Sequence, residues 1–466
     1  MVVGEILVVD LTIVGGRIVT STRTVEAGVA INDGKIVAIG KEATLPKSQR
    51  VIDAKGKLLL PGLIDPHVHF RDPGFPQKGD FTTESKAAAA GGVTTIMDMP
   101  NTKPVVDCVE VFEEKRKIAE SKSIVDFALI GGVGSSNVDE IPKLAEAGAV
   151  YFKTFMGGYG LRENPELSKL LIAEDNVLLQ ALRKGARTGL VQAVHAEDND
   201  LVNFFVQELI NKGKIDLKAF FESRPNIVED EATSRAILLA ENTGCRIHFV
   251  HMSSSGAAEL VRNAKLKGLA VTSETCVHYL MLTSEDALKA GPYGIMVPPL
   301  RSSKDVEALW KAIQNGAIDM IGSDHAPHTV EEKQLGLEDV WKTPLGCIGV
   351  ETTLPLLLTK VNEGRIGLQR LVELTSTNAA KLFSLYPTKG TIEMGSDADL
   401  AIVDLKKKKT IRQEELHSKI KVSLFNGLEV KGVPTTTILR GTIIMEEGEV
   451  TGVLGQGRFV KPSRVR

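Results

Sequence analysis

Short apolar runs separated by glycine turns open the chain. The segments LTIVGGRIVT, VAINDGKIVAIG and VIDAKGKLLLPG, within residues 11–62, have the pattern of short strands. The Asp-Gly pair in INDGKI is typical of a two-residue hairpin turn. The same pattern returns near the end, in GSDADLAIVDL and TTTILRGTIIMEEGEV. We therefore predict that residues 1–62 and 386–466 pair into one small β domain.

The pattern changes between these ends to strands that alternate with helices. Apolar, β-rich runs (VTTIMDMP, VDFALIGGV, AVYFKTFM, GLVQAVHAE, CRIHFVHMS, LAVTSET and IDMIGSD) are separated by helical stretches such as KAAAAGG and ATSRAILLAENTG. About seven βα units over about 320 residues predict a parallel α/β barrel at residues 63–385. An open doubly wound sheet is the alternative, but no GxGxxG follows a strand to support it.

The stretch DPHVHFRDPG, residues 65–74, places two histidines one residue apart with an arginine two residues later. Side chains alternate between the two faces of a strand, so His67 and His69 point the same way if this segment is a strand. Arg71 follows on that side if the strand continues so far. Two imidazoles and a guanidinium directed at one point indicate a metal site beside an anion site.

Polar residues close or interrupt several of the other apolar runs. A single histidine at a strand end is more often structural than functional, but six corresponding strand ends carry such residues. They are His67 and His69, Asn101, Lys153, His195, His251 and Asp324. Reactive groups of a parallel barrel lie at these carboxyl ends. Imidazoles and a carboxylate are suitable ligands for zinc or a similar divalent ion.

Lys153 is the unusual member, because a protonated lysine cannot ligate a metal and its charge would repel one. Two interpretations stay open from the residues alone. Lys153 is an active-site cation, or carbon dioxide has converted it to a carbamate that bridges two metal ions.

Composition excludes several other classes of protein. The chain has 56 basic and 59 acidic residues, a net charge of −3, and no basic stripe of the kind that binds nucleic acid. The run KKKK at 406–409 lies near EEL at 414–416, which favours a solvated face. No apolar run reaches the roughly 18 residues of a membrane span. Four scattered cysteines without a CxxC pair favour free thiols in a reducing cytoplasm.

A family resemblance rests on the combination of several segments. DPHVHFRDPG, MPNT, FKTFM, VHAE, HMSSSGAAELV, ETCVHYL, PPLR, SDHAPHTVEEK and GVETTLPLLL together resemble the cyclic amidohydrolases of the amidohydrolase superfamily. The resemblance covers nearly the whole chain. It implies a (β/α)₈ TIM-like barrel with a β-sandwich domain built from both termini. It also implies two zinc ions held by residues matching His67, His69, carbamylated Lys153, His195, His251 and Asp324.

The activity that this resemblance implies is hydrolysis of an amide bond within a small ring. Metal ions lower the pKa of a bound water so that hydroxide exists near neutral pH. Asp324 then takes the proton of the nucleophile and delivers it to the departing nitrogen. The family also implies a homo-oligomer, either a dimer or a tetramer.

Three further residues address the choice of ring. Arg71, Asn101 and His328 match the positions with which dihydroorotases hold the carboxylate of their substrate. Leu345, in TPLGCIGVE, stands where hydantoinases usually have an asparagine that contacts the ring. The prediction is therefore a dihydroorotase, which interconverts N-carbamoyl-aspartate and dihydroorotate in pyrimidine biosynthesis.

Other segments favour different activities. The stretch FFESRPNIVEDEATSRAILLAENTGCRIHFVHMSS and ETCVHYL resemble allantoinases and hydantoinases, so an allantoinase or a hydantoinase (dihydropyrimidinase) is the alternative. A non-catalytic scaffold would have lost metal ligands, whereas every ligand position is filled here. A single-metal deaminase of the same superfamily would not need Lys153. Candidates for a mobile cover of the site are Gly157, Gly158 and residues 329–345.

Overall fold

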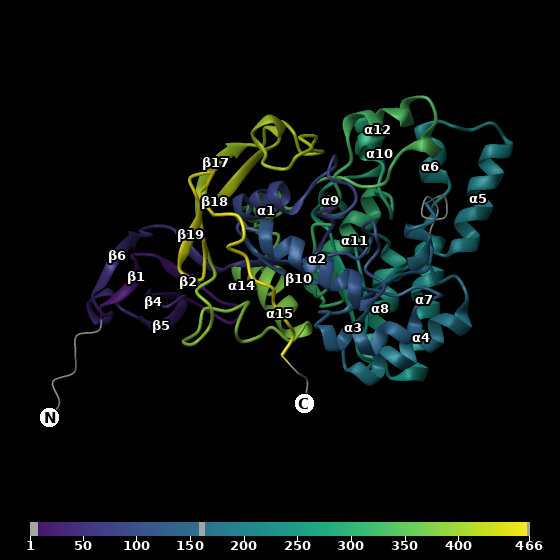
Figure 1. Cartoon of the computed structure of the whole chain (residues 1–466). Coiled ribbons are helices and arrows are strands. Elements are labelled where there is room, and N and C mark those ends of the chain that lie inside the picture. The colour runs from purple at the N-terminus through teal and green to yellow at the C-terminus, as the bar shows by residue number, and fades with distance from the viewer. Residues whose placement is uncertain (1–7, 158–163, 464–466) are drawn as a thin grey trace.

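A computed structural model describes the protein over residues 8–157 and 164–463. Figure 1 shows a β-rich lobe at one end, where the first strands of the chain lie beside the last ones, and a helix-rich body at the other end. Within the described ranges, no helix is long and apolar enough to cross a membrane.

Parallel strands form the centre of the helix-rich body. They belong to two hydrogen-bonded sheets, ordered β10-β9-β8 and β11-β12-β13-β14-β15-β16. The strands are β8 (Leu63–Val68), β9 (Val93–Asp98), β10 (Asp126–Leu129), β11 (Gly131–Gly132), β12 (Phe152–Phe155), β13 (Gln192–His195), β14 (Ile247–Phe249), β15 (Val271–Thr275) and β16 (Met320–Ile321). Nearly all their residues are buried, as expected for strands that are covered on both faces.

The two parallel sheets meet at both edges. Val68 at the end of β8 forms a parallel bridge with His325, just beyond β16, and the His69 N–H donates to the His325 carbonyl at 2.8 Å. At the other edge β11 continues the course of β10, and the Val150 N–H donates to the Leu129 carbonyl at 3.0 Å. These contacts link the strands into a ring, so the predicted TIM-like α/β barrel is confirmed.

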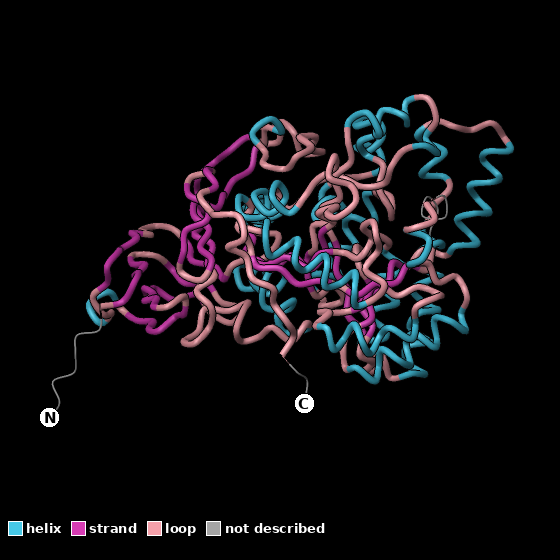
Figure 2. Tube along the Cα trace, viewed as in Figure 1, coloured by secondary structure: helices cyan, strands magenta, loops and turns pink. Residues whose placement is uncertain are grey.

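Helices alternate with the barrel strands and surround them (Figure 2). They are α1 (Phe81–Ala90), α2 (Val109–Lys122), α3 (Ile141–Ala147), α4 (Asp175–Thr188), α5 (Asn199–Asn211), α6 (Leu217–Glu222), α7 (Asn226–Thr243), α8 (Ser255–Leu266), α9 (Val277–Met281), α10 (Ser284–Ala290), α11 (Ser303–Gln314), α12 (Val330–Gln334), α13 (Thr353–Asn362), α14 (Leu368–Val372) and α15 (Asn378–Leu382). The helix predicted at KAAAAGG is α1. Asp80 is the N-cap of this helix, and its carboxylate accepts from the Thr83 N–H at 2.8 Å in a capping box.

Strands from both ends of the chain form two further sheets, ordered β5-β4-β1-β6 and β20-β19-β18-β17-β7-β2-β3. The early strands are β1 (Val9–Val14), β2 (Arg17–Val19), β3 (Thr24–Glu26), β4 (Gly28–Asn32), β5 (Lys35–Gly40), β6 (Ser48–Asp53) and β7 (Leu58–Pro61). The late strands are β17 (Leu400–Thr410), β18 (Glu429–Leu439), β19 (Thr442–Glu446) and β20 (Glu449–Val450). The hairpin predicted at INDGKI joins β4 to β5, with positive φ at Asp33 and Gly34.

The two sheets share one apolar core. Ile13 and Val29 of the first sheet belong to the same buried cluster as Leu59, Ile402 and Ile438 of the second. Two sheets with a common core form a β-sandwich. The pairing of β7 with β17 confirms that both termini build this β-rich part. The boundaries predicted at residues 62/63 and 385/386 stay a prediction.

Buried charges connect the β-sandwich to the barrel. The Lys389 ammonium lies 2.7 Å from Asp126 on β10, 3.1 Å from Asp397 and 2.6 Å from Asp399. These carboxylates resemble a cation site, but the lysine already supplies the cation. Arg440 also contacts Asp126. The pKa of Lys389 is raised despite its burial because three carboxylates face it.

The KKKK run and the four cysteines lie in the surroundings that the sequence predicted for them. The KKKK run lies on β17, where Lys407 pairs with Glu447 and Lys408 with Glu429, all exposed, so it forms a solvated face. The four cysteines are free; two are buried and two half-buried.

Candidate active site

A cavity of about 310 Å³ opens at the carboxyl ends of the barrel strands. It brings together nearly all the candidate residues, although they are up to 261 positions apart in the sequence. Those lining it are His67, His69, Arg71, Asn101, His195, His251, Asp324 and His328. Lys153 does not line the cavity and is fully buried in β12.

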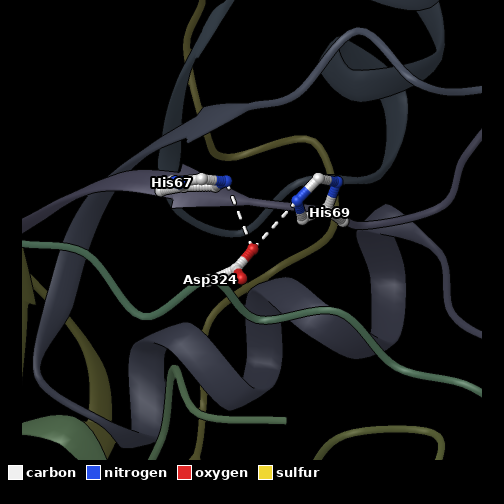
Figure 3. A group of neighbouring side chains, drawn as sticks. All are labelled: His67, His69 and Asp324. Carbon is white, nitrogen blue, oxygen red and sulfur yellow. Dashed lines mark hydrogen bonds and ion pairs between the residues drawn. The ribbon is translucent and has the colours of Figure 1, made fainter. Parts of the chain in front are cut away.

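Asp324 lies between the two histidines of the DPHVHFRDPG segment. Its Oδ1 is 3.2 Å from Nε2 of His67 and 3.1 Å from Nε2 of His69 (Figure 3). Burial acts to raise the pKa of Asp324, but the neighbouring imidazoles outweigh it and hold the pKa well below its ordinary value. Burial lowers the pKa of His69 to about 4. A neutral His69 therefore faces an ionised Asp324 at neutral pH.

Nδ1 of each of these two histidines has a hydrogen-bond partner. Glu274 on β15 accepts a hydrogen bond from Nδ1 of His67, and the side-chain oxygen of Asn101 accepts from Nδ1 of His69 at 2.7 Å. In the tautomer with the proton on Nδ1, Nε2 carries a lone pair that faces the Asp324 carboxylate. In this tautomer the two lone pairs and a carboxylate oxygen converge on one point, where a bound cation would hold them together. This geometry fits a metal ion.

His195 and His251 repeat this arrangement on the next strands. Glu197 accepts from Nε2 of His195 at 2.9 Å, which leaves the Nδ1 lone pair of His195 facing Nε2 of His251 at 2.9 Å. Nδ1 of His251 is buried and has no hydrogen-bond partner within the described residues. Burial, followed by the neighbouring titratable groups of His195, Lys153 and His67, holds the pKa of His251 well below its ordinary value. Nδ1 of His195 and Nε2 of His251 thus lie close together at the cavity, and a neutral imidazole nitrogen is a ligand that divalent metals bind.

Lys153 has the surroundings of a neutral amine. Its Nζ is buried without a hydrogen-bond partner in the described part of the chain and lies 4.9 Å from the centre of the Phe155 ring. Burial lowers its pKa to about 7. About half of such lysines are uncharged at neutral pH, and only the uncharged amine reacts with carbon dioxide.

Three residues of the site have backbones in the left-handed region, which side chains other than glycine seldom adopt. The φ angles are 68° at Arg71, 40° at His251 and 46° at Asp324. Each such residue costs about 1–3 kcal/mol, and strain of this kind gathers at functional sites. Strand β8 ends at Val68, so the strand does not continue to Arg71. The bend at Arg71, rather than strand alternation, directs its side chain into the cavity.

The anion end of the cavity contains more positive charge than the sequence predicted. Arg71 Nη2 lies 2.9 Å from Nε2 of His328, and Arg71 Nε donates to the Pro327 carbonyl at 3.2 Å. Lys78, which the sequence analysis missed, lies 3.2 Å from the other ring nitrogen of His328. Burial, followed by the charges of Arg71 and Lys78, holds the pKa of His328 well below its ordinary value. His328 is therefore neutral between two cations.

Apolar side chains line another part of the cavity. They are Phe155, Leu167, Phe220, Val297, Val340, Trp341 and Leu345. The last three belong to residues 329–345, the predicted cover, and Gly157 also lines the cavity. Gly158 lies outside the described residues. Whether these segments move stays a prediction.

Two glutamates of the site were also missed. Glu274 ends an apolar run in LAVTSET, the criterion that selected the histidines, so the sequence held a signal for it. Glu197 follows His195 by two residues in VHAE. Lys78 lies in the loop PGFPQKGD between β8 and α1, where no periodic pattern marks it.

Comparison with known proteins identifies the family. A family model described as "Amidohydrolase family" matches residues 58–444. The chain belongs to the amidohydrolase family. An L-hydantoinase of Paenarthrobacter aurescens is 40% identical over 97% of this chain and 98% of that protein. An allantoinase of Solibacter usitatus is 38% identical over 96% of each chain. A dihydroorotase of Methanosarcina acetivorans is 37% identical over 98% of this chain and 96% of that protein.

The solved structures agree with the sequence relatives. The L-hydantoinase (dihydropyrimidinase) from Arthrobacter aurescens superposes with a TM-score of 0.93, at 40% identity over 97% of this chain and 100% of that one. The amidohydrolase family and the cyclic amidohydrolase activity predicted from the sequence are thus confirmed. The dihydroorotase prediction is not, because hydantoinase and allantoinase rank ahead of it among the relatives.

Proposed function

We propose that this cyclic amidohydrolase acts on a ring that carries a carboxylate, and that dihydroorotate is its substrate. The observation that carries the proposal is the environment of Arg71. The side chain is 7% exposed, lines the same cavity as His67 and Asp324, and has no carboxylate of the described residues within 4.0 Å of its guanidinium. The carboxylates of Asp324, Asp98, Glu332 and Glu84 act on Arg71 only from a greater distance. The buried guanidinium is therefore able to form a direct ion pair with a ligand carboxylate.

Chemical complementarity supports the same substrate. A guanidinium forms two parallel hydrogen bonds to a carboxylate, which is stronger and more directional than a bond to a neutral carbonyl. Asn101 and His328 line the same cavity and add donors. A ring with a carboxylate at these donors places its amide toward His67, His69 and Asp324.

The metal centre is part of the proposal. We infer two zinc ions held by His67, His69, His195, His251, Asp324 and a carbamate formed on Lys153. The inward lone pairs of the imidazoles and the unpartnered Nζ of Lys153 support it. When bound, such ions lower the pKa of a shared water and polarise the amide carbonyl.

The protein's own residues supply the remaining chemistry. Asp324, ionised at neutral pH, takes a proton from the nucleophile and returns it to the ring nitrogen as the amide bond breaks. Glu274 and Asn101 hold His67 and His69 in the tautomers that leave Nε2 free. Arg71 and the apolar wall fix the ring between them.

A neutral ring is the second candidate. The hydantoinase and allantoinase relatives favour it, and so does the apolar wall of Phe220, Trp341 and Leu345, which suits an uncharged substituent. Overall identities of 37–40% reflect the whole fold, whereas few residues of the cavity select the ring.

The test of the proposal is a substitution at Arg71. Arg71→Met should lower kcat/KM for dihydroorotate by about 30- to 1,000-fold, the loss expected for one charged bidentate contact. Turnover of hydantoin and dihydrouracil, which lack the carboxylate, should change much less, and metal content should stay unchanged. An unaltered kcat/KM for dihydroorotate would remove Arg71 from the substrate site and favour the neutral ring.

A further inference from the structure

Lys78 lies at the cavity although no motif pointed to it. It comes from the loop between β8 and α1, and its side chain is 13% exposed. Nζ is 3.2 Å from Nδ1 of His328 and 3.0 Å from Oε1 of Glu332 on α12. The lysine therefore joins the anion wall to the segment predicted to cover the site.

The ring of His328 cannot accept hydrogen bonds from both of the cations beside it. A neutral imidazole offers one acceptor nitrogen, yet Arg71 lies at Nε2 and Lys78 at Nδ1, both as cationic donors. If Nδ1 accepts from Lys78, Nε2 carries the proton, donates to the Leu345 carbonyl at 3.2 Å and leaves Arg71 Nη2 without its acceptor. If Nε2 accepts from Arg71, the N–H at Nδ1 faces the Lys78 ammonium. Either tautomer leaves one of the two cations without His328 as its acceptor.

The two cations at this wall have one close carboxylate between them. Arg71 and Lys78 supply two positive charges, and Glu332 is the one carboxylate that the described part of the chain places within 4.0 Å of either. Glu332 is about one-third exposed and contacts only the lysine of the two. A ligand carboxylate with two oxygens would satisfy the surplus donor and balance the second charge.

We propose that Lys78 determines specificity by contacting the carboxylate of the ring substrate together with Arg71, while Glu332 holds its ammonium at the cavity wall. This inference rests on the proposed function, because it assigns a second cation to the same substrate group. A neutral ring would offer nothing for Lys78 to neutralise.

The test measures binding rather than turnover. Uracil and orotate share the same ring and differ by the carboxylate of orotate, so the ratio of their dissociation constants isolates that group. Titration calorimetry on the metal-loaded enzyme should show that Lys78→Met weakens orotate binding by about 10-fold or more, without changing uracil binding. Lys78→Arg should keep most of the orotate affinity. The matched control is Lys143→Met, because Lys143 is 63% exposed, pairs with Glu140 and does not line the cavity, so the change should have little effect.

The outcomes separate this inference from the proposed function. A wild-type enzyme that binds uracil as tightly as orotate overturns both. A wild-type enzyme that prefers orotate, with Lys78→Met and Lys143→Met behaving alike, overturns the role of Lys78 alone. If Lys78→Met does not fold, the double variant Lys78→Met/Glu332→Gln removes both charges of the pair. It should show the same selective loss of orotate binding, and unchanged orotate affinity in it would contradict the inference.

Discussion

Oδ1 of Asp324 lies 3.1 Å from Nε2 of His69, although the two residues are separated by 255 positions in the sequence. Asn101 lies at the opposite nitrogen as an acceptor, and in the tautomer that donates to it the short distance joins a lone pair of His69 to a carboxylate oxygen. Such a contact is stable when a cation lies between the two atoms. The same relationship holds between Asp324 and His67. The barrel thus arranges its side chains for a bound metal ion and places the carboxylate where a proton has to move.

Asp324 should be essential for turnover. Asp324→Asn keeps the shape of the side chain but removes the base, so kcat should fall by about 100-fold or more, the usual contribution of a positioned acid–base group. Steady-state kinetics together with metal analysis by mass spectrometry checks this. Asp139→Asn, at a highly exposed carboxylate, serves as the control. Full turnover by Asp324→Asn with its metal bound would refute the proton-transfer role.

Glu274 should control metal retention without touching the substrate. It is fully buried, accepts from Nδ1 of His67, and does not line the cavity. Burial opposes its ionisation, but the adjacent His67 and His248 lower its pKa to about 2. Glu274→Gln should weaken metal binding by about 10- to 100-fold, as for other partners of ligating histidines.

Dialysis against a chelator, followed by metal analysis, measures this loss. Glu84→Gln is the matched control, because Glu84 is equally buried and accepts from His325, which is not a candidate ligand. Equal loss of metal in both variants would show a general destabilisation instead of a role for Glu274.

Carbamate formation on Lys153 should depend on pH in a characteristic way. Only the neutral amine reacts with carbon dioxide, and burial lowers its pKa to about 7. At constant dissolved carbon dioxide, the rate of reactivation of the metal-free enzyme by zinc should rise between about pH 6 and pH 8 and then level off. An ordinary lysine would instead give a rate that climbs tenfold per pH unit to about pH 10. A rate independent of carbon dioxide would rule out the carbamate.

The barrel and the β-sandwich should be coupled through Lys389. Replacing it by methionine leaves Asp126, Asp397 and Asp399 buried together without their central cation. Loss of one partner of a buried ion pair destabilises a protein by about 3–5 kcal/mol, so the free energy of unfolding should fall by that amount. Denaturant unfolding measures it. Lys408→Met, which removes an exposed pair with Glu429, should have almost no effect, and equal effects would contradict the coupling.

The sequence predicted the barrel and most of the site because both depend on local patterns. Buried parallel strands appear as apolar runs, and a polar residue that ends such a run stands out, as His195 and His251 do. The hairpin at Asp33-Gly34 was equally local, since its turn needs residues that accept positive φ.

The rest depends on contacts that no local pattern encodes. Glu274 meets His67 across 207 positions, and Lys78 meets His328 across 250. The left-handed backbone at Arg71 also could not be read from the segment, because surrounding structure imposes strain of that kind. These unpredicted contacts fix the imidazole tautomers and the charge at the anion wall, on which the chemistry depends.

The most direct test of the proposed function is a comparison of kcat/KM for four rings on the zinc- and bicarbonate-treated enzyme. Dihydroorotate carries a carboxylate, whereas allantoin, hydantoin and dihydrouracil do not. We predict that dihydroorotate is preferred by about 100-fold or more, because without the carboxylate the buried cation at the cavity wall stays unpaired. Preference for any of the three neutral rings would contradict the carboxylate assignment of Arg71.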